Sequence, residues 1–239
     1  LIKLQVKNLF LIMKNYLIIG ASSGIGKALS HQLKSEGHQV YETYHSNQIV
    51  GEHAHPLDVE SDFSLDFLPE VLDGIAYCPG SINLMPFARI KPEAFASDFN
   101  LQVMGAIKVI QQALPALKKS AQASVVLFST VAVQKGFNFH AQVATSKGAI
   151  EGLTKSLSAE FAPKIRINAI APSLTDTPLA SKLLSSEDKK AANAERHPLK
   201  RIGTAEDISQ TATFLLSDQS SWITGQVIHV DGGKSAISM

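Results

Sequence analysis

The chain has 239 residues, of which 45% are hydrophobic and 18% charged, and its 22 basic and 21 acidic side chains leave a formal net charge of +1. This balance gives no electrostatic reason to expect a nucleic acid or an anionic membrane as partner. With 15 glycines and 10 prolines, collagen-like and low-complexity disordered classes are excluded. One large domain or two small ones fit this length.

The single cysteine, Cys78, excludes an intramolecular disulfide and fits a reducing compartment, so we expect a cytoplasmic protein. Residues 1–12 mix Lys3 and Lys7 with short apolar runs that no small-residue cleavage site follows. We interpret them as an N-terminal extension before Met13 rather than as a signal sequence. The sequence has no run of about 18 apolar residues that would predict a membrane span.

Apolar runs of strand type alternate with helical patterns along the chain. The predicted elements are, in chain order, a strand at Tyr16–Ile19, a helix at Gly24–Glu36, strands at Gln39–Tyr44, His53–Val59 and Gly74–Cys78, a long helix at about Pro92–Lys119, a strand at Ala123–Ser129, a helix at His140–Phe161, a strand at Ile165–Ile170, a helix at Ala205–Leu216 with Thr204 as N-cap, and a strand at Gln226–Val230. This alternation predicts a single α/β domain over residues 13–239. We expect a Rossmann-type, doubly wound parallel sheet of about seven strands with helices on both faces.

The polar, Lys- and Glu-rich segment 178–199 is the least regular part of the chain, and it lies between two predicted strands. We expect it to be mobile and to form a lid over a bound substrate; an ordinary pair of surface helices is the alternative. The two long helices carry apolar residues on more than one face, including Phe95, Val109, Leu153 and Leu157, which predicts contacts between subunits.

Residues 20–26 read G-A-S-S-G-I-G and join the first strand to the first helix. Glycines at such a turn let the backbone approach a pyrophosphate, and the helix N-terminus presents unpaired N–H groups to it. A tight turn that binds nothing would use the same glycines. The spacing G-x-x-x-G-x-G differs from the commoner G-x-G-x-x-G and is therefore informative.

From Met13 to about Gly233 the chain resembles the short-chain dehydrogenase/reductase family. Several segments resemble its motifs in the same order, namely the glycine turn, L-D-V at 57–59, I-N-A-I-A-P at 167–172, P-L-K-R-I-G at 198–203, W-I-T-G-Q at 222–226 and D-G-G at 231–233. The resemblance implies an NAD(P)-dependent oxidoreductase that binds its cofactor through Gly20, Ser22, Ser23, Gly24, Ile25, Gly26, Tyr44, His45, Ser46, Asp58, Val59, Gly80, Lys147, Pro172 and Thr177. It also implies a homo-oligomer, a tetramer.

In that family a hydride moves between nicotinamide C4 and a carbonyl or alcohol carbon, while a tyrosine exchanges the proton on oxygen. By resemblance, Lys147 matches the lysine that binds the ribose, and Asn100 matches the asparagine that supports it through water. Thr130, with Ser129 just before it, stands at the serine position that binds the substrate oxygen. The tyrosine position is Val143, whose side chain has no proton to give, unless a slip in register hides the real acid.

His140 is the candidate substitute for the missing acid. It lies seven residues before Lys147, so the two share a helix face if the helix already includes His140. Histidine is a competent acid near neutral pH; a solvent-facing histidine at the start of the helix is the alternative. The other histidines show no metal-ligand spacing with Cys78 or with a carboxylate cluster, and we expect no metal site.

The end of the second predicted strand distinguishes the two nicotinamide cofactors. Family members that prefer NAD(H) place a carboxylate there, whereas this chain reads T-Y-H-S-N at 43–47 and has Glu42 only two positions before the usual site. His45, Ser46 and Asn47 could donate hydrogen bonds to a 2′-phosphate. We predict that NADP(H) is preferred and that NAD(H) is also accepted.

Two functions fit these residues. The first is an oxidoreductase that acts on a small carbonyl or alcohol with atypical proton transfer. The second is a catalytically weak or inactive NADP-binding module with a regulatory or assembly role, because a fold does not by itself establish activity. The matched polar residues favour the enzyme. Its pocket is expected to be mostly apolar, with a lining from Met85, Phe87, Phe137, Phe139 and residues 178–199, and to take a hydrophobic carbonyl compound.

Overall fold

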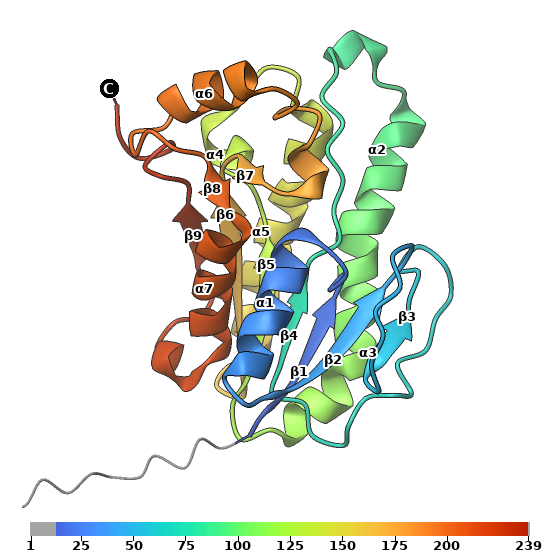
Figure 1. Ribbon diagram of the computed structural model, residues 1–239. Coiled ribbons are helices and arrows are strands. Elements are labelled where there is room, and N and C mark those ends of the chain that lie inside the picture. The colour runs from blue at the N-terminus through green and yellow to red at the C-terminus, as the bar shows by residue number, and fades with distance from the viewer. Residues whose placement is uncertain (1–12, 239) are drawn as a thin grey trace, which may run out of the picture.

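A parallel sheet with the strand order β3-β2-β1-β4-β5-β6-β9 forms the centre of the computed structural model, which describes residues 13–238 (Figure 1). Its strands are β1 (Asn15–Ile19), β2 (Gln39–Tyr44), β3 (Ala54–Pro56), β4 (Gly74–Tyr77), β5 (Ala123–Phe128), β6 (Ile165–Pro172) and β9 (Val227–Val230). Two short strands, β7 (Thr175–Asp176) and β8 (Gly203–Thr204), pair separately. The predicted extension 1–12 lies outside the described residues.

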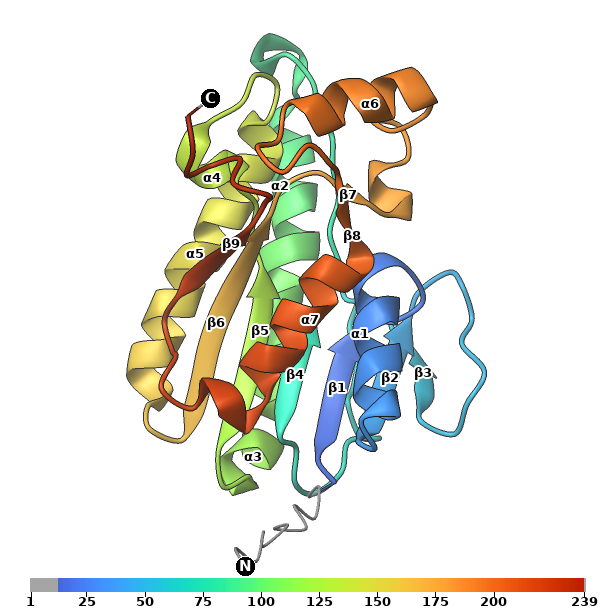
Figure 2. The same cartoon turned by 60° about the vertical axis from the view of Figure 1, so that its left-hand side comes forward.

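Helices cover both faces of the sheet, which confirms the predicted fold class (Figure 1, Figure 2). The helices are α1 (Gly24–Ser35), α2 (Pro92–Phe99), α3 (Gly105–Lys119), α4 (Ala132–Lys135), α5 (Ala141–Phe161), α6 (Glu187–Glu195) and α7 (Ala205–Leu216). In the described part of the chain, no helix is both long and apolar enough to cross a membrane.

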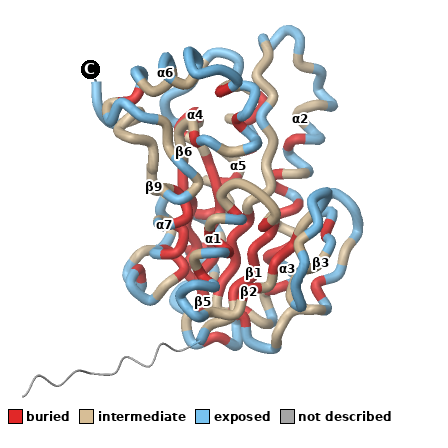
Figure 3. The backbone as a smooth tube through the Cα atoms, in the orientation of Figure 1, coloured by how far each residue is buried: buried red, intermediate tan, exposed pale blue. Residues whose placement is uncertain are grey.

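Successive residues of the central strands enter two separate apolar cores. Leu17 on β1 belongs to the core under α3 and α5, whereas its neighbour Ile18 belongs to the core under α1 and α7. Both side chains are fully buried, because side chains alternate between the faces of a strand and both faces are covered. Figure 3 shows this buried centre within an exposed periphery.

The predicted long helix at 92–119 is three segments rather than one. A π-helical turn, Asn100–Met104, joins α2 to α3. π turns inside α-helices are rare and frequent at functional sites. The phenolic oxygen of Tyr77 donates a hydrogen bond of 2.5 Å to the carbonyl oxygen of Leu101 in this turn. The turn is therefore held directly by the end of β4.

Other predicted boundaries also differ. The third strand is shorter than predicted because Pro56 lacks an N–H and the Asp58 carboxylate then accepts the N–H of Glu60, which turns the chain. The helix predicted from His140 begins at Ala141, with His140 as its N-cap.

The predicted irregular segment 178–199 contains α6 and a 3₁₀ turn, Pro178–Ala180. The hydroxyl of Ser186 caps α6 by accepting the N–H of Lys189, and two acidic residues in the first turn favour the helix dipole. The predicted N-cap at Thr204 is confirmed, with a reciprocal capping box to Asp207.

Candidate active site

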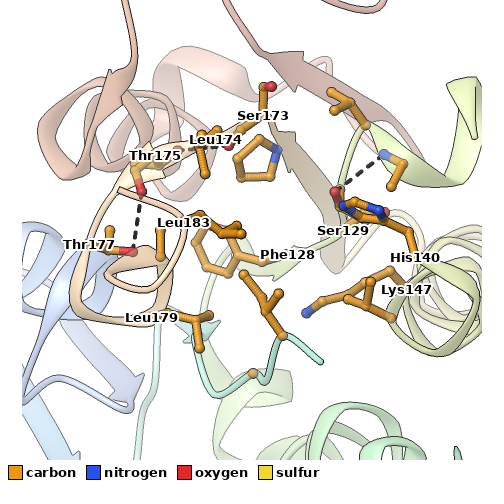
Figure 4. Close-up of a pocket in the computed structure, with 18 of the residues that line it drawn as sticks. Phe128, Ser129, His140, Lys147, Ser173, Leu174, Thr175, Thr177, Leu179 and Leu183 are labelled. Atoms are coloured by element: carbon orange, nitrogen blue, oxygen red, sulfur yellow. Dashed lines mark hydrogen bonds between the residues drawn. The ribbon is translucent and has the colours of Figure 1, made fainter. Parts of the chain in front are cut away.

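The carboxyl ends of the central strands open into a cavity of about 410 Å³. The chain returns from the edge strand β3 to place β4 beside β1, so the strand order reverses next to β1. Ligands of doubly wound sheets bind in the crevice at such a reversal. Figure 4 shows Lys147, Ser129 and His140 on one side of this cavity and Thr177 and Leu179 on the other.

The glycine turn borders this cavity and has little room for side chains. Gly20 and Gly24 have φ angles of +79° and +52°, in the left-handed region that favours glycine. A Cβ atom at Gly26 would lie 2.2 Å from the carbonyl oxygen of Gly20. A Cβ atom at Gly24 would touch Thr177 at 3.4 Å. The structure thus brings Thr177 to the glycine turn at the N-terminus of α1.

The predicted residues near the second strand lie on the neighbouring side of this turn. Thr43, in β2, binds the turn through its hydroxyl, which accepts the N–H of Gly20, and through its carbonyl oxygen, which accepts the N–H of Ala21. Tyr44, His45 and Ser46 follow directly after it. These residues therefore stand beside the glycine turn.

Asp58 and Val59 follow β3 at the same edge of the sheet. Hydrogen bonding from the backbone N–H of Glu60 lowers the pKa of the Asp58 carboxyl. Val59 is buried and packs closely against Gly105, where an added Cβ atom would lie 3.1 Å from the Val59 side chain. Asp58 thus presents a charged carboxylate, while Val59 belongs to the core.

One face of α5 and the end of β5 form the opposite wall. His140, Val143 and Lys147 all line the cavity, since residues three and four apart lie on one face of a helix. Thr130 and Ser129 line it from the end of β5. Within the wall, Val143 is almost completely buried, with 6% of its surface exposed.

The polar groups of this wall differ in how far their hydrogen-bonding capacity is already used. The Ser129 hydroxyl donates a hydrogen bond of 2.6 Å to the carboxylate of Glu151, whereas the Thr130 hydroxyl accepts only a weak bond, at 3.3 Å, from the N–H of Ala132. His140 Nδ1 lies 2.8 Å from the carbonyl oxygen of Asn138, to which it can only donate. Nε2 of His140 is then the ring nitrogen available to a ligand.

Lys147 brings its amine to the middle of the site. Burial lowers the pKa of Lys147 from 10.5 to about 8, and the charges of Asp98 and Cys78 oppose this shift. A Cβ atom at Gly80 would lie 3.7 Å from Nζ of Lys147 and 3.4 Å from Oε1 of Gln102. Both polar groups therefore approach the backbone of Gly80, where a side chain would crowd them.

A buried carboxylate, Asp98, organises the polar groups next to Lys147. It accepts hydrogen bonds from Nε2 of Gln102 at 2.8 Å and from the hydroxyl of Ser146 at 2.6 Å, and a further bond from the hydroxyl of Ser81. Oε1 of Gln102 is buried and has no partner. Since Nε2 is tied to Asp98, this oxygen is a fixed, unused acceptor at the cavity wall.

Asn100, the predicted support of Lys147, is not at this site. It is exposed and does not line the cavity, whereas Gln102 does. Residues two apart on a helix point to nearly opposite sides, so only one of the two can face the cavity. The resemblance pointed to Asn100, and Gln102 was not predicted. The available signal was the i,i+4 pair of Asp98 and Gln102, which places a carboxylate and an amide on one helix face.

The substrate end of the cavity is apolar, but its lining differs from the prediction. Phe137 lines it, whereas Phe87 and Phe139 are 73% and 55% exposed and Met85 lies outside the lining. Phe139 has a φ of +71°, in the left-handed region that few non-glycine residues adopt. The other large apolar side chains of the lining are Ile25, Ile82, Leu84, Phe128, Leu174, Leu179 and Leu183.

The remaining predicted residues lie at or next to the cavity. Ile25, Gly80 and Pro172 line it, and Ser22 and Ser23 belong to the glycine turn. Across residues 13–238, no three His, Cys, Asp or Glu side chains gather in a way that could hold a metal ion.

Comparisons with known proteins agree with this architecture. Residues 20–235 match a family model described as enoyl-(acyl carrier protein) reductase. The chain is 32% identical over 241 residues to 3-oxoacyl-[acyl-carrier-protein] reductase FabG of Thermotoga maritima, covering 91% of this chain and 96% of that protein.

Two solved structures are similar over nearly the whole chain. Aldohexose dehydrogenase of Thermoplasma acidophilum, in ligand-free form, has a TM-score of 0.85 at 26% identity, over 96% of this chain and 98% of that one. A short-chain type dehydrogenase/reductase of Mycobacterium ulcerans has a TM-score of 0.81 at 26% identity, over 93% and 90% of the two chains.

The electrostatics of Lys147 generate a prediction. Competitive acetylation, followed by mass spectrometry across pH 6 to 11, should show Lys147 reacting with a midpoint near pH 8, because only the neutral amine is nucleophilic. Asp98→Asn removes a charge that favours the ammonium, so the midpoint should fall further. Ser146→Ala is the matched control, since it removes a hydrogen bond to Asp98 but keeps the charge. A midpoint near 10.5 in the unmodified protein would contradict the assignment.

Proposed function

The chain belongs to the short-chain dehydrogenase/reductase family of oxidoreductases, and we propose that it transfers a hydride between NADP(H) and a carbonyl or alcohol substrate by a route that lacks the usual tyrosine. One observation carries this proposal. A single cavity joins the glycine turn and Thr177 to Lys147, Gln102 and Thr130.

The residues present fit a dinucleotide. The glycine turn leaves a cradle that a Cβ atom would fill, and the first N–H groups of α1 can bind a pyrophosphate. Thr177 and Pro172 would border the nicotinamide, and Asp58 the adenine. Lys147 would hold the ribose hydroxyls, with Gln102 as the acceptor that orients its ammonium. The cofactor would supply or accept the hydride.

The oxygen of the substrate needs a hydrogen-bond donor and a proton. Thr130 lines the cavity with a hydroxyl that has only one weak bond, so it can donate to that oxygen. Val143 lies where the resemblance places the tyrosine and can exchange no proton. We propose that His140 takes this role through Nε2, as the imidazolium in reduction and as the neutral ring in oxidation.

A binding module without turnover is the second candidate, favoured by Val143 alone. The polar cluster at Lys147 favours the enzyme. Binding a ribose needs only the ammonium of Lys147. Here Asp98, Gln102 and Ser146 also form a buried network, which fixes Oε1 of Gln102 as an acceptor beside Lys147. Buried polar groups are costly unless they are satisfied, and the unpartnered Oε1 of Gln102 is best explained by a ligand or by water that it binds.

The preference for NADP(H) is supported by the position of Glu42. Its carboxylate is buried and accepts bonds from the hydroxyl of Ser30 at 2.5 Å and from Nζ of Lys34 at 2.7 Å. It is thus directed to α1 and neutralised there, away from the strand end where it would repel a 2′-phosphate. His45 and Ser46 at that end remain as donors.

We also propose that residues 178–199 form a mobile lid and that the protein is a cytoplasmic homotetramer. The lid contributes Leu179, Leu183 and Asn193 to the cavity and packs few buried side chains of its own. Three of the four apolar helix residues cited above for subunit contacts do not support the oligomer, because Val109 is fully buried and Leu153 and Leu157 pack against the core, whereas Phe95 is half-buried beside the exposed Phe87. Trp222, which is 99% exposed, is a better candidate for a contact.

The proton route can be tested by replacing two residues of one helix face. Val143→Tyr should raise carbonyl reduction by up to ~10²–10⁴-fold, the range of a placed general acid, if the larger ring fits beside Phe137. His140→Ala should cause a loss of similar size in the unmodified protein and almost none in the Val143→Tyr background. Steady-state rates with a panel of aldehydes and ketones measure both.

Two results would count against this route. Rapid reduction that is unaffected by His140→Ala would show that another group, or water, supplies the proton. Tight cofactor binding without turnover across the whole panel would instead favour the binding module.

Cofactor preference is tested by titration. NADP⁺ should bind at least about tenfold more tightly than NAD⁺, which corresponds to about 1.4 kcal/mol. Glu42→Gln is a sharp control, because a carboxylate already neutralised by Lys34 should not influence the ratio. Equal or tighter binding of NAD⁺ would refute the preference.

Hydrogen exchange tests the lid. Amides of residues 178–199 should exchange rapidly in the free protein and become protected when NADP⁺ and a ketone are added together, because few buried contacts hold the segment before closure. Amides of α7 should not respond. Slow exchange that cofactor leaves unchanged would identify the segment as an ordinary pair of surface helices.

A further inference from the structure

Three basic side chains from distant parts of the chain gather at the rim of the cavity. Lys135 ends α4, Arg196 follows α6, and Lys234 follows β9. Nζ of Lys135 donates a hydrogen bond of 2.8 Å to the carbonyl oxygen of Lys234, and Nζ of Lys234 donates one of 2.7 Å to that of Arg196. We call these three residues the basic rim.

The basic rim has no acidic counterpart among the described residues. None of its members forms an ion pair, whereas three cations within or just after residues 178–199 do: Lys190 pairs with Asp176 and Glu187, Lys200 with Glu195, and Arg201 with Asp207. The nearby carboxylate of Asp231 is already occupied by the N–H groups of Gly233 and Ser235 and by the Ser235 hydroxyl.

The charges of the rim also act on one another. Burial lowers the pKa of Lys234, and the neighbouring charges of Lys135 and Arg196 lower it further. Like charges that are brought together without a counterion destabilise the folded state. A bound anion would remove this repulsion, and the guanidinium of Arg196 can bind a carboxylate or a phosphate with two parallel hydrogen bonds.

The position of the rim separates it from the cofactor side. Arg196 and Lys234 line the cavity, and Figure 2 shows the C-terminal segment beside α4, near the β9 edge of the sheet, whereas α1 lies by β1 and β2. An apolar stretch that includes Phe137, Leu174 and Leu183 lines the same cavity. The cavity therefore combines a polar centre at Lys147, an apolar lining and a basic rim.

We propose that the basic rim binds an anionic group of the substrate, a carboxylate or a phosphate, separated from the reacting carbonyl by an apolar body. This proposal rests on the proposed function, because it assigns a substrate class to the same cavity. It predicts discrimination between substrates that differ only in one charge.

The test compares 4-acetylbenzoate with its methyl ester by calorimetry, on protein saturated with NADP⁺. A ketone and the oxidised cofactor cannot react, so the measurement reports binding without turnover. The acid should bind about tenfold more tightly than the ester. Raising the salt from 50 to 500 mM should weaken binding of the acid and leave the ester unaffected. 4-Acetylphenyl phosphate, measured in parallel, shows whether a phosphate is preferred to a carboxylate.

Variants of the basic rim test whether the preference for the acid over the ester arises there. Lys234→Met and Arg196→Gln should each reduce the preference for the acid several-fold, and the double variant should abolish it while the ester binds as before. Lys200→Met is the matched control, since it removes a cation just after the lid that is paired with Glu195 and does not line the cavity. Thermal unfolding verifies that each variant is folded.

The outcomes separate the two proposals. Equal affinities of acid and ester, no measurable binding of the acid, or a preference that survives in the double variant would each overturn the anion site. Preferential binding of the acid without reduction of any carbonyl in the presence of NADPH would uphold the site and refute the enzyme.

Discussion

Burial of the sheet on both faces is the constraint from which the rest of the structure follows. The central strand β1 has no solvent-facing side, since Leu17 and Ile18 enter opposite cores. Polar side chains within the strands, such as Ser124, Arg166 and Asn168, are buried and already hydrogen-bonded, so the groups free to act on a ligand lie at the strand ends. At the carboxyl ends the chain must also turn sharply, and the glycines that permit this turn leave backbone N–H groups free for an anion.

The second constraint is the cost of placing an amine in that crevice. Burial makes the ammonium of Lys147 less stable than in water, and Asp98 offsets part of this effect at some distance. Asp98 is itself almost inaccessible and needs several donors, which Gln102, Ser146 and Ser81 provide. Two helices and one loop are thereby linked around one carboxylate, so the site is rigid where its chemistry requires a fixed geometry.

Local sequence patterns were sufficient for much of the fold. Apolar runs identified the strands, and Thr204 with Asp207 identified the start of α7, because these signals depend on residues that are close in the chain. The wall residues Thr130, Val143 and Lys147 were also found from the sequence, by resemblance and by helical spacing. Phe139 was placed wrongly: it is exposed and lies outside the lining, in a loop whose backbone, with a positive φ at this residue, no local pattern reports.

The basic rim could not be predicted from the sequence, and the only local signal for Gln102 was its i,i+4 spacing from Asp98. The rim joins residues about 100 and about 40 positions apart, which only the folded chain brings together. Gln102 lies in the π turn and lines the cavity, and the hydrogen bond from Tyr77 that holds this turn comes from β4, which is distant in the sequence. Both arrangements depend on tertiary structure.

The π turn has a consequence for how this site could have arisen. Such a turn contains one residue more than the α-helical turn it replaces, and each residue of an α-helix advances the side chains by about 100°. Deleting one residue between Asn100 and Met104 would therefore rotate α2 relative to α3 and carry Asp98 away from Ser146. This helix would lose the contact between its buried carboxylate and α5 through deletion of a single codon, without any substitution at Asp98 or Ser146.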